Sequence, residues 1–254
     1  IPNKMLKNIF KISVLLLSTH SFAQESLYDI SEHDFTENDS VKRLREVVVI
    51  AKNNPTKSSV NRSGIKTMDL PQAVQVIGTE MIQQQQSIRL SDIIKNANGV
   101  YVGSARGGAQ ESFWSRGYDM SSNNMFKNGF RFSSGSIPEV SSLEKVEILK
   151  GSSALLYGNV APGGILNMVT KTPNFKTGGE VSMQAGSYNF YKPAVDVYGA
   201  FNHSIAYRLN ASYENSESFR DFVSKERYYF NPSLLFRVSE KTDITVQGDY
   251  MSDD

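Results

Sequence analysis

Apolar and polar residues alternate along the C-terminal part of the chain, as they do in β-strands that have one apolar and one polar face. The clearest run covers residues 205–213, and similar runs cover residues 181–185, 195–201, 228–236 and 244–250. This pattern predicts five antiparallel strands. We expect a short turn at Asn202-His203 and a long polar loop over residues 214–227.

Two architectures produce this alternation. In a transmembrane β-barrel the apolar residues face lipid and the polar residues face the lumen, and short turns on one side alternate with longer loops on the other. In a soluble antiparallel sheet the apolar face covers a core and the polar face is wet. The alternation by itself is compatible with both.

Short strands and short helices are expected between residues 67 and 173, which predicts a small α+β domain. Thr79 and Ser91 are expected to cap two helices through their hydroxyl groups, and Asn128-Gly129 is the sequence signal of a type I′ hairpin. The strands are expected at residues 73–77, 99–103, 146–149 and 165–169, and a helical turn at residues 152–157.

The N-terminus has the pattern of an export signal. Lys4, Lys7 and Lys11 precede the apolar run at residues 12–17, and small residues flank Phe22 before Gln24. The run is too short to cross a bilayer, which takes about 20 apolar residues, and polar residues follow it at once. We therefore expect residues 1–23 to be a secretory signal peptide rather than the first helix of a folded domain.

Residues 24–66 are expected to form a linker in the periplasm. Residues 24–44 are polar and acidic, and such a composition cannot bury enough apolar surface to offset the entropy of ordering. A compact β-prone segment interrupts the linker at residues 45–51. Either this segment stays unpaired until a partner adds to it, or it is the first strand of the folded domain.

Composition excludes several classes of site. The 254 residues carry a net charge of +1 and contain no cysteine, so we expect no thiolate chemistry and no overall field for nucleic acid. His20, His33 and His203 are far apart, and no metal site is expected. The glycines at 151, 158, 163 and 164 fit no nucleotide-binding spacing, and no nucleophile elbow occurs. We expect a protein that is not an enzyme.

Several segments, in order, resemble a known family. Residues 70–77, Leu-Pro-Gln-Ala-Val-Gln-Val-Ile, resemble the opening of the plug domain in TonB-dependent siderophore receptors. The resemblance continues at residues 90–94, 98–100, 116–118 and 128–129. It is most specific at residues 143–152, Leu-Glu-Lys-Val-Glu-Ile-Leu-Lys-Gly-Ser, followed by residues 156–158 and 162–167.

The resemblance implies a fold and a function. The fold would be an α+β plug domain at residues 67–173, followed at residues 178–254 by the first five or so strands of a large antiparallel transmembrane β-barrel of about 22 strands. The protein would be a monomer in the outer membrane of a Gram-negative bacterium. It would import ferric siderophores, driven by TonB from the inner membrane, and would need no cofactor because iron arrives chelated. Five strands cannot close a barrel, so we expect no transport by them alone.

The resemblance also assigns residues. The TonB box would consist of Glu46, Val47, Val48, Val49, Ile50 and Ala51. Arg116 and Lys150 stand where the family has arginines that lock the plug to the barrel wall, although a lysine lacks the bidentate fork; a surface charge on a hairpin is the alternative for Arg116. Arg106, Trp114 and Tyr118 would contact the ligand, unless Trp114 is a core residue.

Other functions remain open from the sequence. A TonB-dependent importer of haem, cobalamin or glycans would have the same plug. A surface adhesin built on a barrel would need neither a plug nor a TonB box, so these two features distinguish it from an importer.

Overall fold

The computed structural model describes residues 59–60, 69, 72–106, 110–121, 123–132, 137–151 and 154–254. The chain divides into two units, Ile1–Lys52 and Asn53–Asp254, and every described residue belongs to the second unit. The expected signal peptide and the expected TonB box at residues 45–51 lie outside the described residues.

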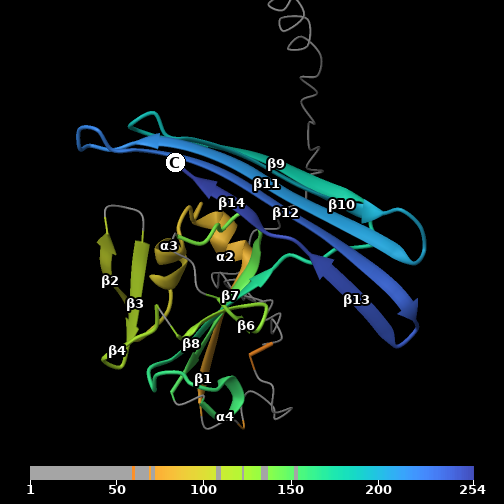
Figure 1. Ribbon diagram of the computed structural model, residues 1–254, viewed down its shortest axis with the longest axis horizontal. Coiled ribbons are helices and arrows are strands. Elements are labelled where there is room, and N and C mark those ends of the chain that lie inside the picture. Colours follow the sequence, from red (N-terminus) through yellow and green to blue (C-terminus); the bar gives the residue numbers. More distant parts are fainter. Residues whose placement is uncertain are drawn as a thin grey trace, which may run out of the picture. The chain divides into compact units, whose positions relative to one another are not determined.

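Two sheets and three short helices build the described part of the α+β domain (Figure 1). One sheet has the order β1-β7-β8-β5-β6, in which only β5 and β8 are parallel. The other has the order β2-β3-β4. No helix among the described residues is long and apolar enough to cross a membrane. The bounds are β1 Ala73–Gly78, α2 Thr79–Gln84, α3 Leu90–Ile94, β2 Val100–Arg106, β3 Gln110–Ser115, β4 Tyr118–Asp119, β5 Met125–Lys127, β6 Phe130–Arg131, β7 Leu143–Lys150, α4 Ala154–Tyr157 and β8 Gly164–Thr170.

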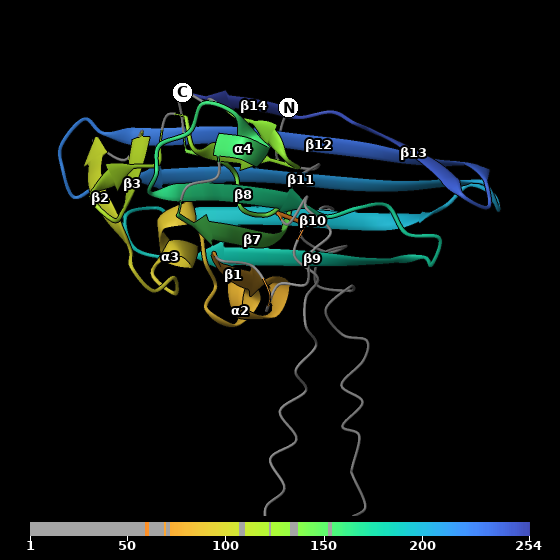
Figure 2. The same cartoon turned by 90° about the horizontal axis from the view of Figure 1, so that it is seen from below.

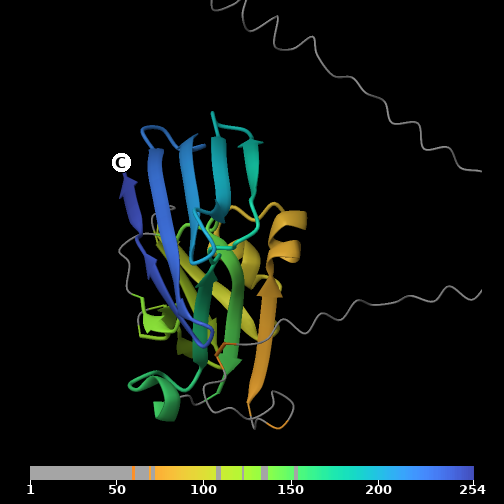
Figure 3. The same cartoon turned by 90° about the vertical axis from the view of Figure 1, so that its right-hand side faces the viewer.

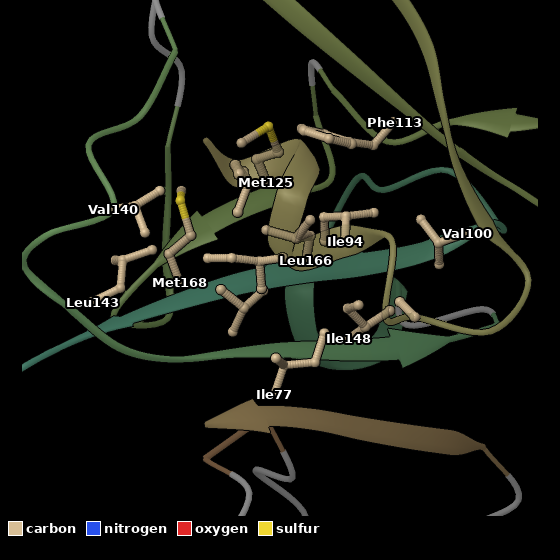
Figure 4. Packing of buried hydrophobic residues seen from close by; sticks show 14 of the residues in the cluster. Ile77, Ile94, Val100, Phe113, Met125, Val140, Leu143, Ile148, Leu166 and Met168 are labelled. Carbon is tan, nitrogen blue, oxygen red and sulfur yellow. The ribbon is translucent and has the colours of Figure 1, made fainter. Parts of the chain in front are cut away.

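The apolar core lies between the β7–β8 sheet and helix α3 (Figure 4). The strands β7 and β8 are buried along almost their whole length; the sequence of β8 is mostly apolar, whereas β7 also buries the charged side chains of Lys145 and Glu147. Ile148 and Leu166 are partners across these two strands, and both are fully buried against Ile94. Figure 3 shows β1, β7 and β8 side by side, in the order that the hydrogen-bonded pairing gives.

The two expected helix caps are wrong. Residue Gly78 precedes α2 without a side-chain cap, and the Thr79 hydroxyl instead donates to the backbone oxygen of Glu144 at 2.5 Å. At α3, the Asp92 carboxylate accepts the N–H of Arg89 at 3.0 Å, which satisfies a free donor of the first turn. Ser91 is used for packing between elements: its hydroxyl donates to Glu111 on β3.

The expected hairpin is confirmed. Asn128 and Gly129 have φ angles of 52° and 82°, the left-handed conformation that both central residues of a type I′ turn require. The pair Lys127 and Phe130 closes the turn. Strands β3 and β4 were not expected, because their short, mixed sequences show no alternation that is long enough to detect.

A second body of strands, β9 to β14, follows the α+β domain (Figure 2). The order is β13-β12-β11-β10-β9, all antiparallel, and β14 pairs with β12 beyond the end of β13. The expected loop at residues 214–227 is wrong, because β11 and β12 pair as far as Glu217 and Ser224. The bounds are β9 Gly178–Ala185, β10 Tyr191–Ala200, β11 Ile205–Glu217, β12 Ser224–Ser239, β13 Thr242–Gln247 and β14 Tyr250–Asp253.

Burial on this sheet is the reverse of that in a water-soluble protein. Phe230 is 45% exposed, whereas the next residue, Asn231, is fully buried. The exposed apolar residues of the outer face are Val181, Met183, Val195, Tyr228, Phe230, Leu234, Ile244, Val246 and Tyr250. The buried polar residues of the inner face are Lys192, Asp196, Asn210, Ser212, Glu214, Arg227, Asn231 and Ser233. Apolar outside and polar inside is the arrangement of a transmembrane barrel wall.

Candidate functional site

The polar face of β9–β14 contacts the α+β domain through a buried carboxylate. Glu139, in the segment between β6 and β7, is only 3% exposed. Its Oε1 atom lies 2.7 Å from Nζ of Lys192 on β10 and accepts the N–H of Ser141 at 3.1 Å. Its Oε2 atom lies 3.6 Å from Nη1 of Arg227 on β12. One carboxylate of the domain thus faces cations from two strands.

The two cations belong to a larger ion-pair network on the sheet. Lys192 also lies 3.3 Å from Glu214 of β11, which is 2.7 Å from Lys225. Arg227 donates to both carboxylate oxygens of Asp253 on β14, at 2.5 and 2.9 Å. Three carboxylates and three cations, counting Glu139, therefore balance one another. We call this set the Glu139 network; its members are Glu139, Lys192, Glu214, Lys225, Arg227 and Asp253.

The surroundings keep Glu139 ionised. Burial alone would raise the pKa of this carboxyl group, because it disfavours the charged form. The charge of Lys192, its hydrogen bond, the N–H of Ser141 and the charge of Arg227 outweigh burial, and the pKa lies below its ordinary value. The carboxylate is therefore negatively charged throughout the neutral range.

Further polar contacts join the domain to the sheet. Lys171, just after β8, lies 2.8 Å from Asp196 on β10, and Asp196 also accepts two hydrogen bonds from Arg208. Lys127 pairs with Asp249. The hydroxyl groups of Ser142 and Tyr229 lie 2.7 Å apart, both buried. Ion pairs and hydrogen bonds therefore join the domain to β10, β11 and β12.

A cavity of about 550 Å³ lies between the domain and strands β9 and β10. Helix α2 and residues 86–88 line one side, and Glu180, Gln184 and Lys192 line the other. The hydroxyl of Ser87, which lines this cavity, is buried without a hydrogen-bond partner among the described residues. Amide contacts join the domain to β9 here, Gln83 Nε2 to Glu180 Oε2 at 3.0 Å and Gln184 Nε2 to the backbone oxygen of Gln86 at 3.4 Å, whereas the ion pairs Lys171–Asp196 and Lys192–Glu139 reach β10. No group of side chains among the described residues could hold a metal ion.

The expected ligand residues are only partly brought together. Trp114 lies on β3 and Tyr118 follows on β4, which pairs with it. The backbone of Arg106 pairs with Gln110 at the other end of the β2–β3 hairpin. The ring of Trp114 lies so close over Gly103 that a Cβ there would come within 2.6 Å of it. Neither Trp114 nor Tyr118 lines the cavity. The ligand role of these residues stays a prediction.

The expected lock residues lie next to each other. Arg116 adopts a φ of 53° in the β3–β4 turn, and Lys150 ends β7. Burial and the nearby charge of Arg116 lower the pKa of Lys150, and its ammonium donates to Gln75 at 3.3 Å. Within the described part of the chain, the ion pairs found between the domain and β9–β14 use other residues, so the lock stays a prediction.

The Glu139 network was not predicted from the sequence. The alternation of the strands places three charged residues on the polar face of the sheet, namely Lys192, Glu214 and Arg227. This concentration of charge on one face was a signal in the sequence that could have indicated an ion-pair network. Glu139 gave no signal, because it follows Ile137-Pro138 in a segment without periodicity and its partners are more than 50 residues away in sequence.

A second buried carboxylate ties the start of the described chain to the core. Glu147 on β7 is fully buried and accepts the backbone N–H and the hydroxyl of Ser59, at 2.7 and 2.6 Å. Lys145 lies 2.9 Å from it, and Asn167 donates at 3.1 Å. We call this the Glu147 clip. It fixes the chain eight residues after the segment that ends at Ala51.

Comparison with known proteins gives one family. Residues 66–165 match the model of the TonB-dependent receptor plug domain. The metal-pseudopaline receptor CntO of Pseudomonas aeruginosa is 28% identical over 203 residues, which are 76% of this chain and 28% of that receptor. The catecholate siderophore receptor Fiu of Escherichia coli is 30% identical over 187 residues, 72% of this chain and 24% of that receptor. The closed crystal form of E. coli Fiu, the ferric-catecholate import receptor, superimposes with a TM-score of 0.67 at 29% identity, over 73% of this chain and 27% of that one. The chain thus spans less than a third of the length of these relatives.

Proposed function

Because this chain carries the plug domain of TonB-dependent receptors and is similar over most of its length to siderophore receptors, we propose that the full-length protein imports a ferric siderophore across the outer membrane. Residues 67–173 are the plug, and residues 178–254 begin the barrel wall. The observation that carries this proposal is the reversed burial of β9–β14. Their apolar face is exposed, and their polar face is bound to the plug.

Import by such a protein makes and breaks no covalent bond. Residues 46–51 add as a strand to an exposed sheet edge of TonB, and the backbone hydrogen bonds of that strand transmit a pull to the plug. The pull reaches the folded domain at the Glu147 clip. The plug then separates from the wall at its polar contacts, beginning at β9, which amide contacts rather than ion pairs join to the plug among the described residues.

The ligand is an anionic or carbonyl-rich iron chelate. Arg106 supplies hydrogen-bond donors and charge for such a chelate, and Tyr118 supplies an exposed aromatic surface. Iron is the cargo and arrives already chelated. TonB and the lipid of the outer membrane are the other partners.

Uptake of radioactive iron by iron-starved cells tests the proposal. Cells lacking the gene are supplied with the full-length gene and offered catecholate, hydroxamate and pseudopaline-type chelates one at a time. Uptake of one class is expected to depend on the gene. If no chelate class depends on it, siderophore import is wrong.

A substitution in the expected TonB box tests the energy source. Val49→Pro removes a backbone N–H and is expected to abolish uptake, because the added strand loses a hydrogen bond and its extended pairing. Binding of the chelate to the cell surface is expected to persist. The matched control, Val49→Ile, keeps the backbone donor and is expected to take up iron like the parent. Uptake that survives Val49→Pro would assign residues 46–51 another role.

A further inference from the structure

Lys192 and Arg227 project from two different strands of the wall and converge on one carboxylate of the plug. We propose that these two side chains form an anion-binding site on the barrel wall, which Glu139 occupies at rest and which an acidic group of the passing chelate occupies when the plug moves. The site binds the carboxylate or phenolate oxygens of a solute. This inference rests on the proposed import function.

The two cations are partly committed to other groups. Arg227 keeps a bidentate pair with Asp253, and Lys192 keeps a contact of 3.3 Å with Glu214. The shortest contact of Lys192 is to Glu139, at 2.7 Å. When Glu139 leaves, Lys192 loses its best partner, and Arg227 loses a second carboxylate.

The charge balance of the network changes in the same step. Without Glu139, three cations face the two carboxylates of Glu214 and Asp253, which leaves one positive charge in excess on an inward face. Charges in so enclosed a place are poorly screened by salt. An excess cation here attracts an anion far more strongly than one on an open surface.

The geometry of the Glu139 contact also favours its replacement by another carboxylate. Its Oε2 atom is buried without a hydrogen-bond partner, and its distance to Arg227 exceeds that of a hydrogen bond. A carboxylate that uses one oxygen well and the other poorly is readily replaced by another that uses both. When Glu139 departs, Lys192 and Arg227 lose a partner, which costs free energy. An incoming acidic group that binds both cations offsets this cost.

Chemical rescue tests the site in the full-length receptor. Glu139→Ala removes the carboxylate arm and leaves a space of similar size beside Lys192 and Arg227. We expect the melting temperature to fall and sodium acetate to restore it by a few degrees, because acetate binds the folded state alone (about 2–4 °C for a ligand in moderate excess). Sodium chloride at the same ionic strength is expected to restore less.

Glu144→Ala is the matched control. Glu144 is an exposed carboxylate five residues further on, with no side-chain partner in the network. For this variant and for the parent, acetate and chloride are expected to act alike. The double variant Glu139→Ala/Arg227→Gln is expected to lose the preference for acetate. If acetate rescues Glu139→Ala no better than chloride does, the anion site is wrong.

A disulfide tests whether Glu139 leaves its place during transport, and it does not depend on how Glu139→Ala folds. The hydroxyl oxygens of Ser141 and Ser212 lie 3.4 Å apart, and the 254 residues contain no cysteine. The pair Ser141→Cys/Ser212→Cys can therefore bond plug to wall beside Glu139. Oxidation is expected to reduce uptake about tenfold or more, because the disulfide holds the plug segment against the wall. Addition of a reductant is expected to restore uptake. Equal uptake in both redox states would mean that this segment does not move.

The two proposals fail differently. If the parent receptor imports no chelate, siderophore import is wrong, while acetate rescue still reports on Lys192 and Arg227. If the parent imports a chelate and acetate rescue is absent, only the anion site is wrong.

Discussion

Glu139 and Glu147 are both buried carboxylates, but their hydrogen bonding differs. Ser59, Asn167 and Lys145 surround Glu147, and donors reach both of its oxygens. Glu139 has hydrogen bonds to one oxygen only. A fully satisfied buried carboxylate holds one arrangement firmly, whereas a partly satisfied one is easier to exchange. The first suits a permanent anchor, and the second suits a contact that breaks and reforms, as the proposed import requires.

Removing the charge of Glu147 should loosen the start of the domain. Glu147→Gln breaks a buried ion pair with Lys145 and places an amide donor against the donors of Ser59, so we expect a loss of about 3 kcal/mol in stability. Hydrogen exchange of the full-length receptor should show faster exchange at residues 59–60 and along β7. Glu144→Gln, an exposed change on the same strand, should stay within about 0.5 kcal/mol. Unchanged exchange in Glu147→Gln would contradict the clip.

The Glu139 network should also make plug attachment depend on pH. Glu139 faces Lys192 on β10 and Arg227 on β12, with Glu214 of β11 nearby, and its pKa is lowered from the ordinary 4.5. A lowered pKa means that its contribution is complete above about pH 4.5 and is lost as the pH falls through the lowered value.

The comparison with Glu139→Gln isolates this group from the other acids. The variant should be less stable than the parent at pH 7, and the difference should shrink progressively below pH 4.5. Thermal unfolding of both proteins across this range measures it. A difference that stays constant down to pH 2 would contradict the ionised state of Glu139.

At the scale of elements, the pairing of β7 with β8 depends on one glycine. Gly164 has a φ of +123° and pairs with Lys150; a Cβ there would collide with the backbone oxygen of Leu149 and lie 2.9 Å from Cα of Lys150. Both the backbone conformation and the space therefore require glycine.

Gly164→Ala is expected to destabilise the plug by roughly 2–5 kcal/mol, from backbone strain and overpacking together. Gly158→Ala is the control, because Gly158 also has a positive φ but nothing within 4 Å of an added Cβ. It should cost only about 1 kcal/mol, the strain of a left-handed residue. Limited proteolysis compares the stability of the plug in the two variants, and the plug of Gly164→Ala is expected to be cleaved faster. Similar protection in both would mean that β7 and β8 can shift to make room.

Periodic elements were predictable from the sequence, and their ends were not. Apolar runs such as 73–77 and 146–149 are strands because their side chains fill a core, and alternation predicts barrel strands wherever one face is apolar. Residues 214–227 read as a loop because Glu214, Lys225 and Arg227 are charged. In the structure these charges lie on the inner face of strands, where Lys225 pairs with Glu214 and Arg227 pairs with Asp253. The expectation that charged residues lie in loops fails for a sheet whose inner face is polar.

The candidate site was predictable only where local sequence defines it. The positive-φ turn at Asn128-Gly129 follows from two neighbouring residues. The contact of Glu139 with Lys192 and Arg227 arises from packing between elements distant in sequence, and a single sequence carries no information on such pairs. The same limit applies to the Glu147 clip, whose members come from residues 59, 145, 147 and 167.

The molecule as a whole presents an apolar band to its surroundings. The band crosses the sheet in register: Val181 opposes Val195, and Ala211 opposes Phe230, which opposes Tyr250. Aromatic rings gather towards its two ends. One end of the band carries the contacting rings of Tyr191, Tyr213 and Tyr228, and the other end carries those of Phe201 and Tyr207. Aromatic residues at both borders of an apolar band are typical of membrane interfaces.

A charge in the middle of the band should prevent insertion of the full-length protein. Phe230→Arg is expected to cost about 2–4 kcal/mol in a bilayer, whereas Ser239→Arg, at the exposed end of the same strand, should cost at most about 1 kcal/mol. Folding into lipid vesicles, measured by the shift in gel mobility between heated and unheated samples, compares them. Equal insertion of both variants would show that Phe230 does not face lipid.

Strand β1 has a mechanical consequence for the plug. Among the residues that the structure describes, it is the first strand, it lies at the margin of its sheet, and its one bonded neighbour is β7, through six residue pairs. A pull from the N-terminal side can therefore break the hydrogen bonds between β1 and β7 one pair after another, while β7, β8 and β5 stay paired with one another. The domain would then have a part that yields and a part that keeps its shape, and under the proposed import a passage would open and reseal without refolding of the whole domain.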